Sequence, residues 1–326
     1  MKVVAQAGYG PPEVLHVEER PAPAPAGNEV LVRVRAASVT KFDCWQRSCT
    51  APLGFGLLAR FANGLLRPRQ PVLGTDLAGA VEAVGPGVTR FSPGDAVWAY
   101  TGAGLGAWVE YRCFPEDGMI AGKPGNLSFE EAGSCLQGFL TALFFLRKGG
   151  TGPGRRVLVY GASGGVGMAA VQVARHMGAE VTGVCSAGKA DLVRSLGAAE
   201  VLDYRRDDLS GDGPVYDVVL DTVGRAPMSR IRRALKPGGV YLMTTFSLPR
   251  LFRALWLRLA RGRKIGLGML RETPDDLALL GQLFENGAIR PVLDRTFTME
   301  EAPDAGRYVE SGGKAGSVAL VMKMGE

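Results

Sequence analysis

The sequence predicts an α/β protein of two domains, in which a β-rich domain drawn from both ends of the chain flanks a doubly wound parallel sheet. Three observations predict this class. The 326 residues exceed a single ordinary core and favour two domains. Residues 1–125 carry short apolar runs of period two, broken by Gly and Pro. From Arg156 strands and helices alternate, and the chain ends in strand-like sequence again.

The β-rich part begins the chain. Its expected strands are residues 29–39, 77–85, 95–100 and 107–114. Their close spacing, with turn residues between them, favours a compact and mostly antiparallel sheet or barrel. After it, Ser128 and Glu131 form a capping box, and the apolar run that follows predicts a helix as far as Leu146.

The middle of the chain predicts βαβ units. Apolar residues at helical spacing indicate a helix over residues 166–177. The strands around it are residues 157–160, 180–185, 200–204, 216–223 and 238–244. Such alternation is typical of a parallel sheet with helices on both faces. Beyond it we expect helices from Thr273 and after Thr298, with strands over 289–299 and 317–322.

The composition is that of a globular protein, with 46% hydrophobic and 21% charged residues. No run reaches the ~18 apolar residues that span a bilayer, and the start, MKVVAQAGYG, has no signal-peptide character. Five scattered cysteines argue against a disulfide framework, and Cys44 and Cys49 lack the spacing of a metal or redox pair. We therefore expect structural thiols and a reduced, cytoplasmic setting.

The net charge of +6 is unevenly spread. Residues 222–271 contain twelve Lys or Arg and no Asp or Glu. Within them, residues 246–264 place apolar side chains on one helical face and arginines mostly on the other. Such a basic amphipathic helix can roof a substrate cleft or a subunit interface, lie on an anionic membrane, or bind nucleic acid. We favour the roof or the interface.

A glycine-rich turn, YGASGGVG, joins a predicted strand to a predicted helix at residues 160–167. Its glycines let the backbone approach a pyrophosphate, whose charge the N–H groups and dipole of the helix start would hold. The alternative is a tight turn without a ligand. Because the turn lies inside a βαβ unit, we expect a dinucleotide here, contacted by Ser163, Gly164, Gly165 and Val166.

The end of the next strand indicates which dinucleotide binds. An acid there bonds the ribose hydroxyl of NAD, but this strand ends in Cys185 and Ser186, followed by Lys189. A hydroxyl and an ammonium suit a 2′-phosphate, so we expect NADPH, with Tyr204 beside the phosphate or the adenine. In the alternative interpretation, Lys189 is a solvated helix residue and Ser186 only caps a helix.

Nearly the whole chain resembles the zinc-independent quinone oxidoreductases, the zeta-crystallin-like group of the medium-chain dehydrogenase/reductase superfamily. The stretches that carry the resemblance occur in the family's order: AASVTKFD, PVLGTDLAGAVEAVG, FSPGDAVWA, KPGNLSFEEAG, VLVYGASGGVG, LGAAEVLDY, DTVG and LKPGGV. The resemblance implies a GroES-like catalytic domain over residues 1–124 and 287–326, and a Rossmann domain over residues 125–286. It also implies hydride transfer from NADPH to a quinone or an α,β-unsaturated carbonyl, and a homodimer.

Zinc-dependent relatives hold their metal at three positions, which in this chain are Thr40, Thr75 and Gln137. None of these residues is a good zinc ligand. Catalytic zinc needs converging His, Cys or carboxylate ligands, and the chain has only two histidines. We therefore expect no metal.

The resemblance also implies which residues face the substrate and the cofactor. Thr40 and Thr141 would face the nicotinamide, with Lys41, Asp43 and Tyr100 as neighbours in the cleft. The expected contacts on the far side of the cofactor are Val223, Thr245 and Phe246.

Two questions stay open at this point. Lys41 either stabilises an enolate or quinol oxygen or is a plain surface lysine. The rival functions are a zinc-free alcohol dehydrogenase or reductase, and an NADPH-bound RNA-binding or structural protein with little turnover.

Overall fold

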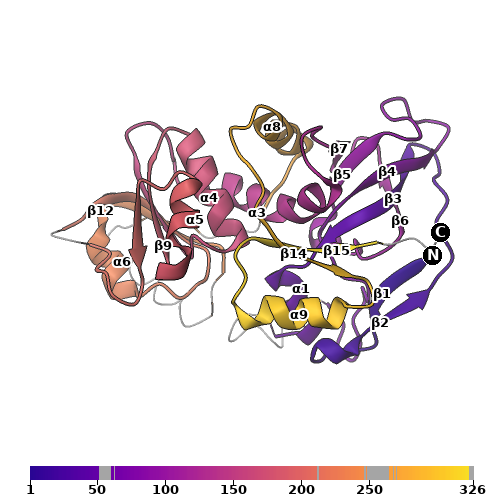
Figure 1. Ribbon diagram of the computed structural model, residues 1–326, viewed down its shortest axis with the longest axis horizontal. Coiled ribbons are helices and arrows are strands. Elements are labelled where there is room, and N and C mark those ends of the chain that lie inside the picture. Colours follow the sequence, from indigo (N-terminus) through magenta and orange to yellow (C-terminus); the bar gives the residue numbers. More distant parts are fainter. Residues whose placement is uncertain are drawn as a thin grey trace. The chain divides into compact units, whose positions relative to one another are not determined.

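The computed structural model describes residues 1–50, 60–61, 63–210, 213–245, 247, 264–266, 268 and 270–322 (Figure 1). The chain divides into two compact units. The first unit is built from Met1–Ala51, Gly56–Gln137 and Glu272–Glu326, and the second from Pro52–Phe55 and Gly138–Arg271. One unit is rich in antiparallel strands and the other holds a parallel sheet, which confirms the predicted fold class.

Strand β3 (Glu29–Ser38) is the centre of the first unit. It pairs antiparallel with β4 (Asp76–Val84), β6 (Tyr111–Pro115) and β15 (Ser317–Val321). Through the described residues the sheet runs β14-β15-β3-β4-β5-β7, which adds β5 (Ala96–Tyr100), β7 (Ile120–Gly122) and β14 (Leu293–Thr298). A separate hairpin consists of β1 (Lys2–Gln6) and β2 (Leu15–Glu19). The last strand of the chain therefore lies in one sheet with the first half.

This unit includes helices α1 (Lys41–Ser48), α8 (Pro274–Glu285) and α9 (Ala302–Ser311), with 3₁₀ turns η1 (Pro12–Val14) and η2 (Gly102–Gly104). Helix α3 (Phe129–Lys148) contains the boundary between the units. Apolar residues of the strands and of the segments between them pack into one core that includes Val34, Leu77 and Trp108. In the part of the chain that the structure describes, no helix is long and apolar enough to cross a membrane.

The compact units divide near Gln137 and Arg271, and the predicted domain limits at 124 and 287 stay predictions. The Asn126 side chain donates a hydrogen bond to Phe284 O at 2.8 Å. The Phe284 ring lies edge-on to Trp98 of β5, with ring centroids 5.7 Å apart. These contacts, made between residues far apart in sequence, hold α8 and the segment before α3 on the β-rich unit.

The second unit contains a parallel sheet with helices on both sides. Its described strands are β8 (Arg156–Tyr160), β9 (Glu180–Cys185), β10 (Glu200–Asp203), β11 (Tyr216–Asp221), β12 (Leu235–Met243) and β13 (Lys264–Gly266). Numbered from 1 to 6 in chain order, they lie across the sheet as 3-2-1-4-5-6, the order typical of dinucleotide-binding domains. In Figure 1, α4 (Gly165–His176) and α5 (Ala190–Ser195) lie on one side and α6 (Met228–Ala234) on the other.

Some elements were not expected from the sequence. Helix α1, the 3₁₀ turn η3 (Ala187–Lys189) and the short α5 are new. The strand expected over 107–114 begins only at Tyr111. Before it, Ala107 N and Trp108 N donate hydrogen bonds to Gly74 O and Leu73 O, outside the β3 pairing. Most of the basic block at 246–264 lies outside the described residues.

Candidate functional site

Thr40 begins helix α1 in the first unit. Its backbone is extended, and its side chain accepts a hydrogen bond from Asp43 N. In return, Asp43 Oδ2 accepts bonds from Thr40 N at 2.8 Å and from Thr40 Oγ1 at 2.6 Å. This is a reciprocal capping box, so the Thr40 hydroxyl has a fixed orientation at the helix start.

The second oxygen of Asp43 reaches a distant part of the chain. It accepts a hydrogen bond from Gly74 N at 2.8 Å. Gly74 has φ +91°, and a Cβ at this position would lie 2.4 Å from the Trp108 ring. Only glycine fits this turn, and Asp43 therefore ties the start of α1 to the turn that leads into β4.

A second carboxylate, Asp76, lies at the start of β4. Its Oδ1 accepts a hydrogen bond from Thr75 Oγ1 at 2.5 Å, and its Oδ2 accepts one from Gln137 N at 2.9 Å. The Thr75 hydroxyl also lies 3.3 Å from Ser38 Oγ. The three positions aligned with zinc ligands are thus bound to two buried carboxylates.

Burial governs the protonation of these two acids. Asp43 and Asp76 are 1% and 0% exposed. Loss of hydration raises the pKa of each carboxyl to about 6, although the hydrogen bonds from Thr40 and Thr75 favour the charged form. Because Asp43 is enclosed, it can position Thr40 but cannot itself contact a substrate.

Tyr100 and Lys41 differ in exposure. Tyr100 ends β5 directly opposite Asp76 and is 6% exposed. Burial, with the charges of Asp76 and Glu272, raises the pKa of Tyr100 far above its usual range, so its hydroxyl stays protonated as a hydrogen-bond donor. Lys41 lies exposed in the first turn of α1, with no ion pair to any described residue.

The glycine-rich turn of the second unit forms a cradle. Gly161 follows β8 with φ +85°, and Gly164 is the N-cap of α4. A Cβ on Gly167 would lie 2.0 Å from Gly161 O. The turn and the helix start therefore pack closer than any side chain would allow, and the N–H groups of Gly165 and Val166 lie in the first turn of α4.

Buried Asp221 organises the neighbouring strand end. Its Oδ1 accepts bonds from Val223 N at 3.1 Å and Gly224 N at 2.8 Å. A Cβ on Gly224 would lie 2.5 Å from Thr245 O. Val223 and Thr245 thus meet at the carboxyl ends of β11 and β12, beside the point where the strand order reverses. Phe246 lies outside the described residues.

Thr141 lies on α3, within the second unit. It follows Gly138 by three residues, so the two share a helix face. A Cβ on Gly138 would lie 3.0 Å from Gly165 O. The face of α3 that carries Thr141 therefore packs on the start of α4.

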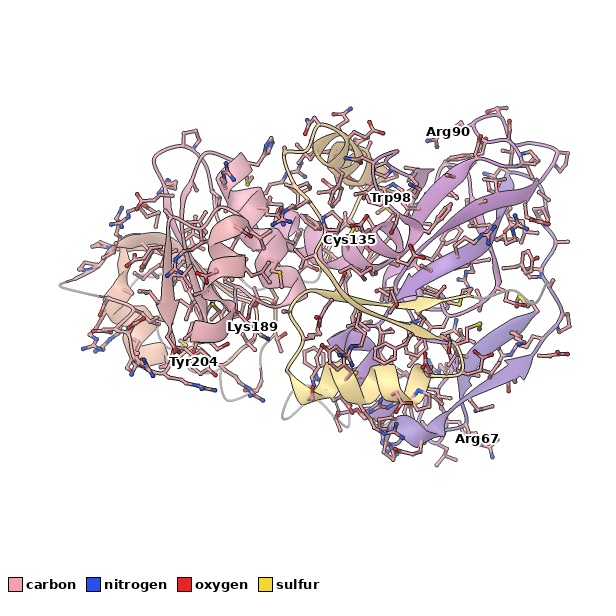
Figure 2. All side chains as sticks on the ribbon, in the orientation of Figure 1. Arg67, Arg90, Trp98, Cys135, Lys189 and Tyr204 are labelled. Carbon is pink, nitrogen blue, oxygen red and sulfur yellow. The ribbon has the colours of Figure 1, made fainter. Side chains whose placement is uncertain are left out.

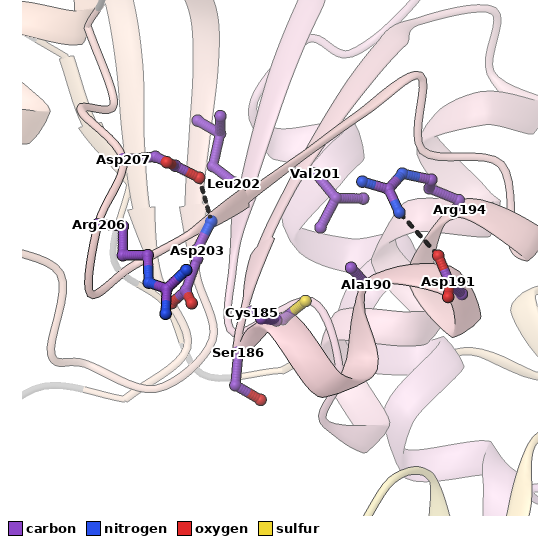
Figure 3. A pocket seen from close by; sticks show the side chains of 11 residues that line it. Cys185, Ser186, Ala190, Asp191, Arg194, Val201, Leu202, Asp203, Arg206 and Asp207 are labelled. Carbon is purple, nitrogen blue, oxygen red and sulfur yellow. Dashed lines mark hydrogen bonds and ion pairs between the residues drawn. The ribbon is translucent and has the colours of Figure 1, made fainter.

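A pocket of about 350 Å³ opens at the carboxyl ends of β9 and β10. Ser186, a predicted cofactor contact, is among the residues that line it. Figure 3 shows Asp191 paired with Arg194 at one end and Asp203, Arg206 and Asp207 at the other. Arg206 also lines the pocket and was not predicted; the pair of arginines directly after Tyr204 could have indicated it.

Lys189 and Tyr204 lie at the same edge of this unit (Figure 2). Burial and Asp203 raise the pKa of the Cys185 thiol and Lys189 lowers it, which places Lys189 near the end of β9. Tyr204 is 40% exposed and its hydroxyl accepts a bond from Arg205 Nε at 3.1 Å. The carboxylates of Asp203 and Asp207 also line the pocket, and neither residue was predicted to lie there.

The chain resembles known oxidoreductases over almost its full length. Residues 26–124 match the alcohol dehydrogenase GroES-like domain, and residues 196–320 match a family described as zinc-binding dehydrogenase. The quinone-oxidoreductase QR1, chloroplastic, of Triphysaria versicolor is 30% identical, with 98% of each chain covered. The chain belongs to the quinone oxidoreductase group of the medium-chain dehydrogenase/reductase superfamily.

Two further members of this superfamily extend the comparison. The 2-methylene-furan-3-one reductase of Solanum lycopersicum is 30% identical, with 98% of this chain and 79% of that protein covered. The solved structure of Escherichia coli quinone oxidoreductase complexed with NADPH is 27% identical, with a TM-score of 0.82 and coverage of 99% of this chain and 100% of that chain. Both support an oxidoreductase of small molecules.

The residues of this chain do not fit the zinc ion that one family name implies. The hydroxyls of Thr40 and Thr75 already donate to Asp43 and Asp76, and Gln137 offers only an amide. Over the described residues, no three His, Cys, Asp or Glu side chains are grouped to hold a metal. The Cys44 thiol is also a poor ligand, because burial raises its pKa to about 12.

Proposed function

We propose that this oxidoreductase transfers a hydride from NADPH to a quinone or an α,β-unsaturated carbonyl without a metal. One observation carries the proposal: at the metal-ligand positions of zinc-dependent relatives, hydroxyls are hydrogen-bonded to buried carboxylates. A zinc-free alcohol dehydrogenase would need a base for the alcohol proton, and the enclosed Asp43 and Asp76 are unsuited to that role.

In this proposal the second unit holds the cofactor. Bound NADPH supplies the hydride. The first turn of α4, with Ser163, would hold the pyrophosphate through Gly164, Gly165 and Val166. The other proposed contacts are Thr141, Ser186, Lys189, Tyr204, Val223 and Thr245, with Phe246 still a prediction from sequence.

The first unit would supply the groups around the acceptor. Reduction places negative charge on an oxygen, which a nearby donor must stabilise. Tyr100 offers a protonated hydroxyl and Lys41 an exposed ammonium. Asp43 acts as a positioning residue that fixes Thr40. The homodimer and the cytoplasmic setting stay predictions.

The test is NADPH oxidation with a para-benzoquinone and with an unsaturated ketone, each in the presence and absence of a metal chelator. We expect turnover of at least one acceptor, unchanged by the chelator. Loss of activity with the chelator, or faster oxidation of a simple alcohol, would contradict the proposal. Tight RNA retention without turnover of any acceptor would favour the non-enzymatic alternative.

The choice of NADPH is measured in the same assay. Lys189→Ala and Arg206→Ala each remove a cation from the region of Ser186, and a charge-assisted phosphate contact contributes roughly 1.5–3 kcal/mol. We therefore expect the KM for NADPH to rise about tenfold or more, with the KM for NADH unchanged. Equal effects on both cofactors would refute the assigned 2′-phosphate site.

A further inference from the structure

The described residues 60–61 and 63–69, which end a helix and form the turn after it, are named here the 60–69 loop, and several of their apolar side chains are exposed. Phe61 is 60% exposed, Leu65 52% and Leu66 85%. The other large hydrophobic residues found exposed in the described chain are Tyr204 and Val223, which belong to the proposed cofactor site. Exposed apolar groups that cluster in one segment mark an interaction surface.

The 60–69 loop is held in place. Tyr9 donates a hydrogen bond to Gly64 O at 2.9 Å, and the Asn63 side chain donates one to Gln46 of α1 at 2.8 Å. Arg69 N bonds Asn63 O at 2.7 Å and closes the turn, in which Gly64 has φ +118°. The backbone therefore keeps Leu65 and Leu66 at the tip instead of letting them fold inward.

All the charged residues of this part of the sequence are basic. Arg60, Arg67 and Arg69 lie in the loop, and residues 44–75 contain no Asp or Glu. Arg60 stacks over the Tyr9 ring, with its guanidinium 5.3 Å from the ring centroid. Figure 2 shows Arg67 at the outer edge of the first unit.

We propose that the 60–69 loop docks on the surface of an anionic lipid bilayer. Leu65 and Leu66 would enter the boundary between headgroups and acyl chains, where apolar side chains are transferred out of water. The arginines would remain among the anionic headgroups, which attract basic residues close to the surface. The apolar tip thus matches the acyl-chain boundary of such a membrane, and the basic residues beside it match the anionic headgroups.

A second copy of the chain fits this surface less well. Three partly exposed side chains provide roughly a few hundred Å² of apolar area, whereas a stable dimer interface buries about 800 Å² on each partner. Reversible membrane binding needs less area, because apolar insertion and attraction to anionic lipid act together.

The test is co-sedimentation of the full chain with vesicles. Phosphatidylcholine vesicles are compared with vesicles that also contain phosphatidylserine, and we expect binding to the second kind that weakens with added salt. The double variant Leu65→Ser, Leu66→Ser should bind about thirtyfold more weakly, and Arg67→Glu about tenfold. Arg90→Glu makes the same charge change at the opposite end of the unit in Figure 2 and should bind like the parent.

Thermal unfolding of each variant shows that the fold is kept, since the substituted side chains are exposed. No binding to phosphatidylserine vesicles would overturn the proposal. So would equal binding by the parent and the double variant, or equal losses for Arg67→Glu and Arg90→Glu. A dimer that the leucine substitutions dissociate, in a chain that does not bind vesicles, would assign the 60–69 loop to a second copy instead.

Discussion

Asp43 joins two parts of the chain that must stay in register for the proposed site to form. Its carboxylate accepts hydrogen bonds from Thr40 N, Thr40 Oγ1 and Gly74 N. The Asp43 side chain is 1% exposed, so these three hydrogen bonds replace the ones that water would make to its carboxylate oxygens. Replacing a single oxygen atom of this side chain is therefore expected to lower both the stability and the activity of the protein.

Asp43→Asn tests this. The asparagine has one acceptor oxygen, and its NH₂ group would face Gly74 N or Thr40, leaving buried donors unpaired. We expect the free energy of unfolding to fall by about 3 kcal/mol. Denaturant unfolding measures this, and turnover of the proposed acceptors should fall as well, because Thr40 loses its fixed orientation.

Asp95→Asn is the matched control. Asp95 is exposed and accepts a hydrogen bond from Ser92 N at 2.8 Å in the turn before β5. Its replacement should change stability by about 1 kcal/mol or less. If both asparagine variants lost the same stability, Asp43 would have no special role.

The sequence contained part of this arrangement. Thr40 and Asp43 stand three residues apart, which is the spacing of a capping box, but no helix was predicted after the strand expected over 29–39. The spacing could have predicted helix α1. The bond from Gly74 could not be predicted, because 31 residues separate it from Asp43.

At the scale of elements, the β8–α4 turn was predictable because its signal is local. Four glycines within seven residues follow a strand and precede an amphipathic helix. The structure adds the reason for one of them. Gly167 lies so close to Gly161 O that a Cβ would approach it to 2.0 Å.

Gly167→Ala should therefore move the turn away from α4. The oxygen it meets belongs to the backbone and cannot rotate aside, so we expect a loss of about 1–3 kcal/mol in stability. NADPH affinity should fall with it, because the N–H groups of α4 lose their alignment. NADPH titration and thermal unfolding measure the two effects.

Gly152→Ala provides the comparison in the same unit. A Cβ at Gly152 meets no atom within 4 Å, and its φ is not positive. This variant should bind NADPH and unfold like the parent. An NADPH affinity for Gly167→Ala equal to that of Gly152→Ala would show that close packing at the turn is not needed.

At the scale of the molecule, the sequence predicted the fold class, whereas the domain limits at 124 and 287 stay predictions. The spacing of apolar residues indicates which side chains face a core, and this spacing can be seen in a short stretch of sequence. Contacts such as Phe284 with Trp98 join segments far apart and leave no local pattern. In the structure they join α8 to the β-rich unit.

The two buried acids also predict how the first unit responds to pH. Asp43 and Asp76 have pKa values raised from 3.8 to about 6 in the folded chain, so folding favours their protonated forms. Their contribution to stability is full below the unfolded pKa and is lost as pH rises through about 6. Each accounts for up to about 3 kcal/mol. Glu13 and Glu18 have lowered pKa values, so their contributions fall only at more acidic pH.

The first unit should therefore be less stable at about pH 7 than at about pH 5. Trp45, Trp98 and Trp108 belong to this unit, so tryptophan fluorescence during urea unfolding reports mainly on it. Asp76→Asn should remove about half of the pH dependence, since Asp43 keeps the rest. Asp217→Asn is the control, because the carboxyl of Asp217 has a lowered pKa, with hydrogen bonds from Arg156 N and Lys236 outweighing its burial, and should leave the pH dependence unchanged. A parent protein whose stability rises between these pH values would show that the hydrogen bonds to Asp43 and Asp76 outweigh their burial.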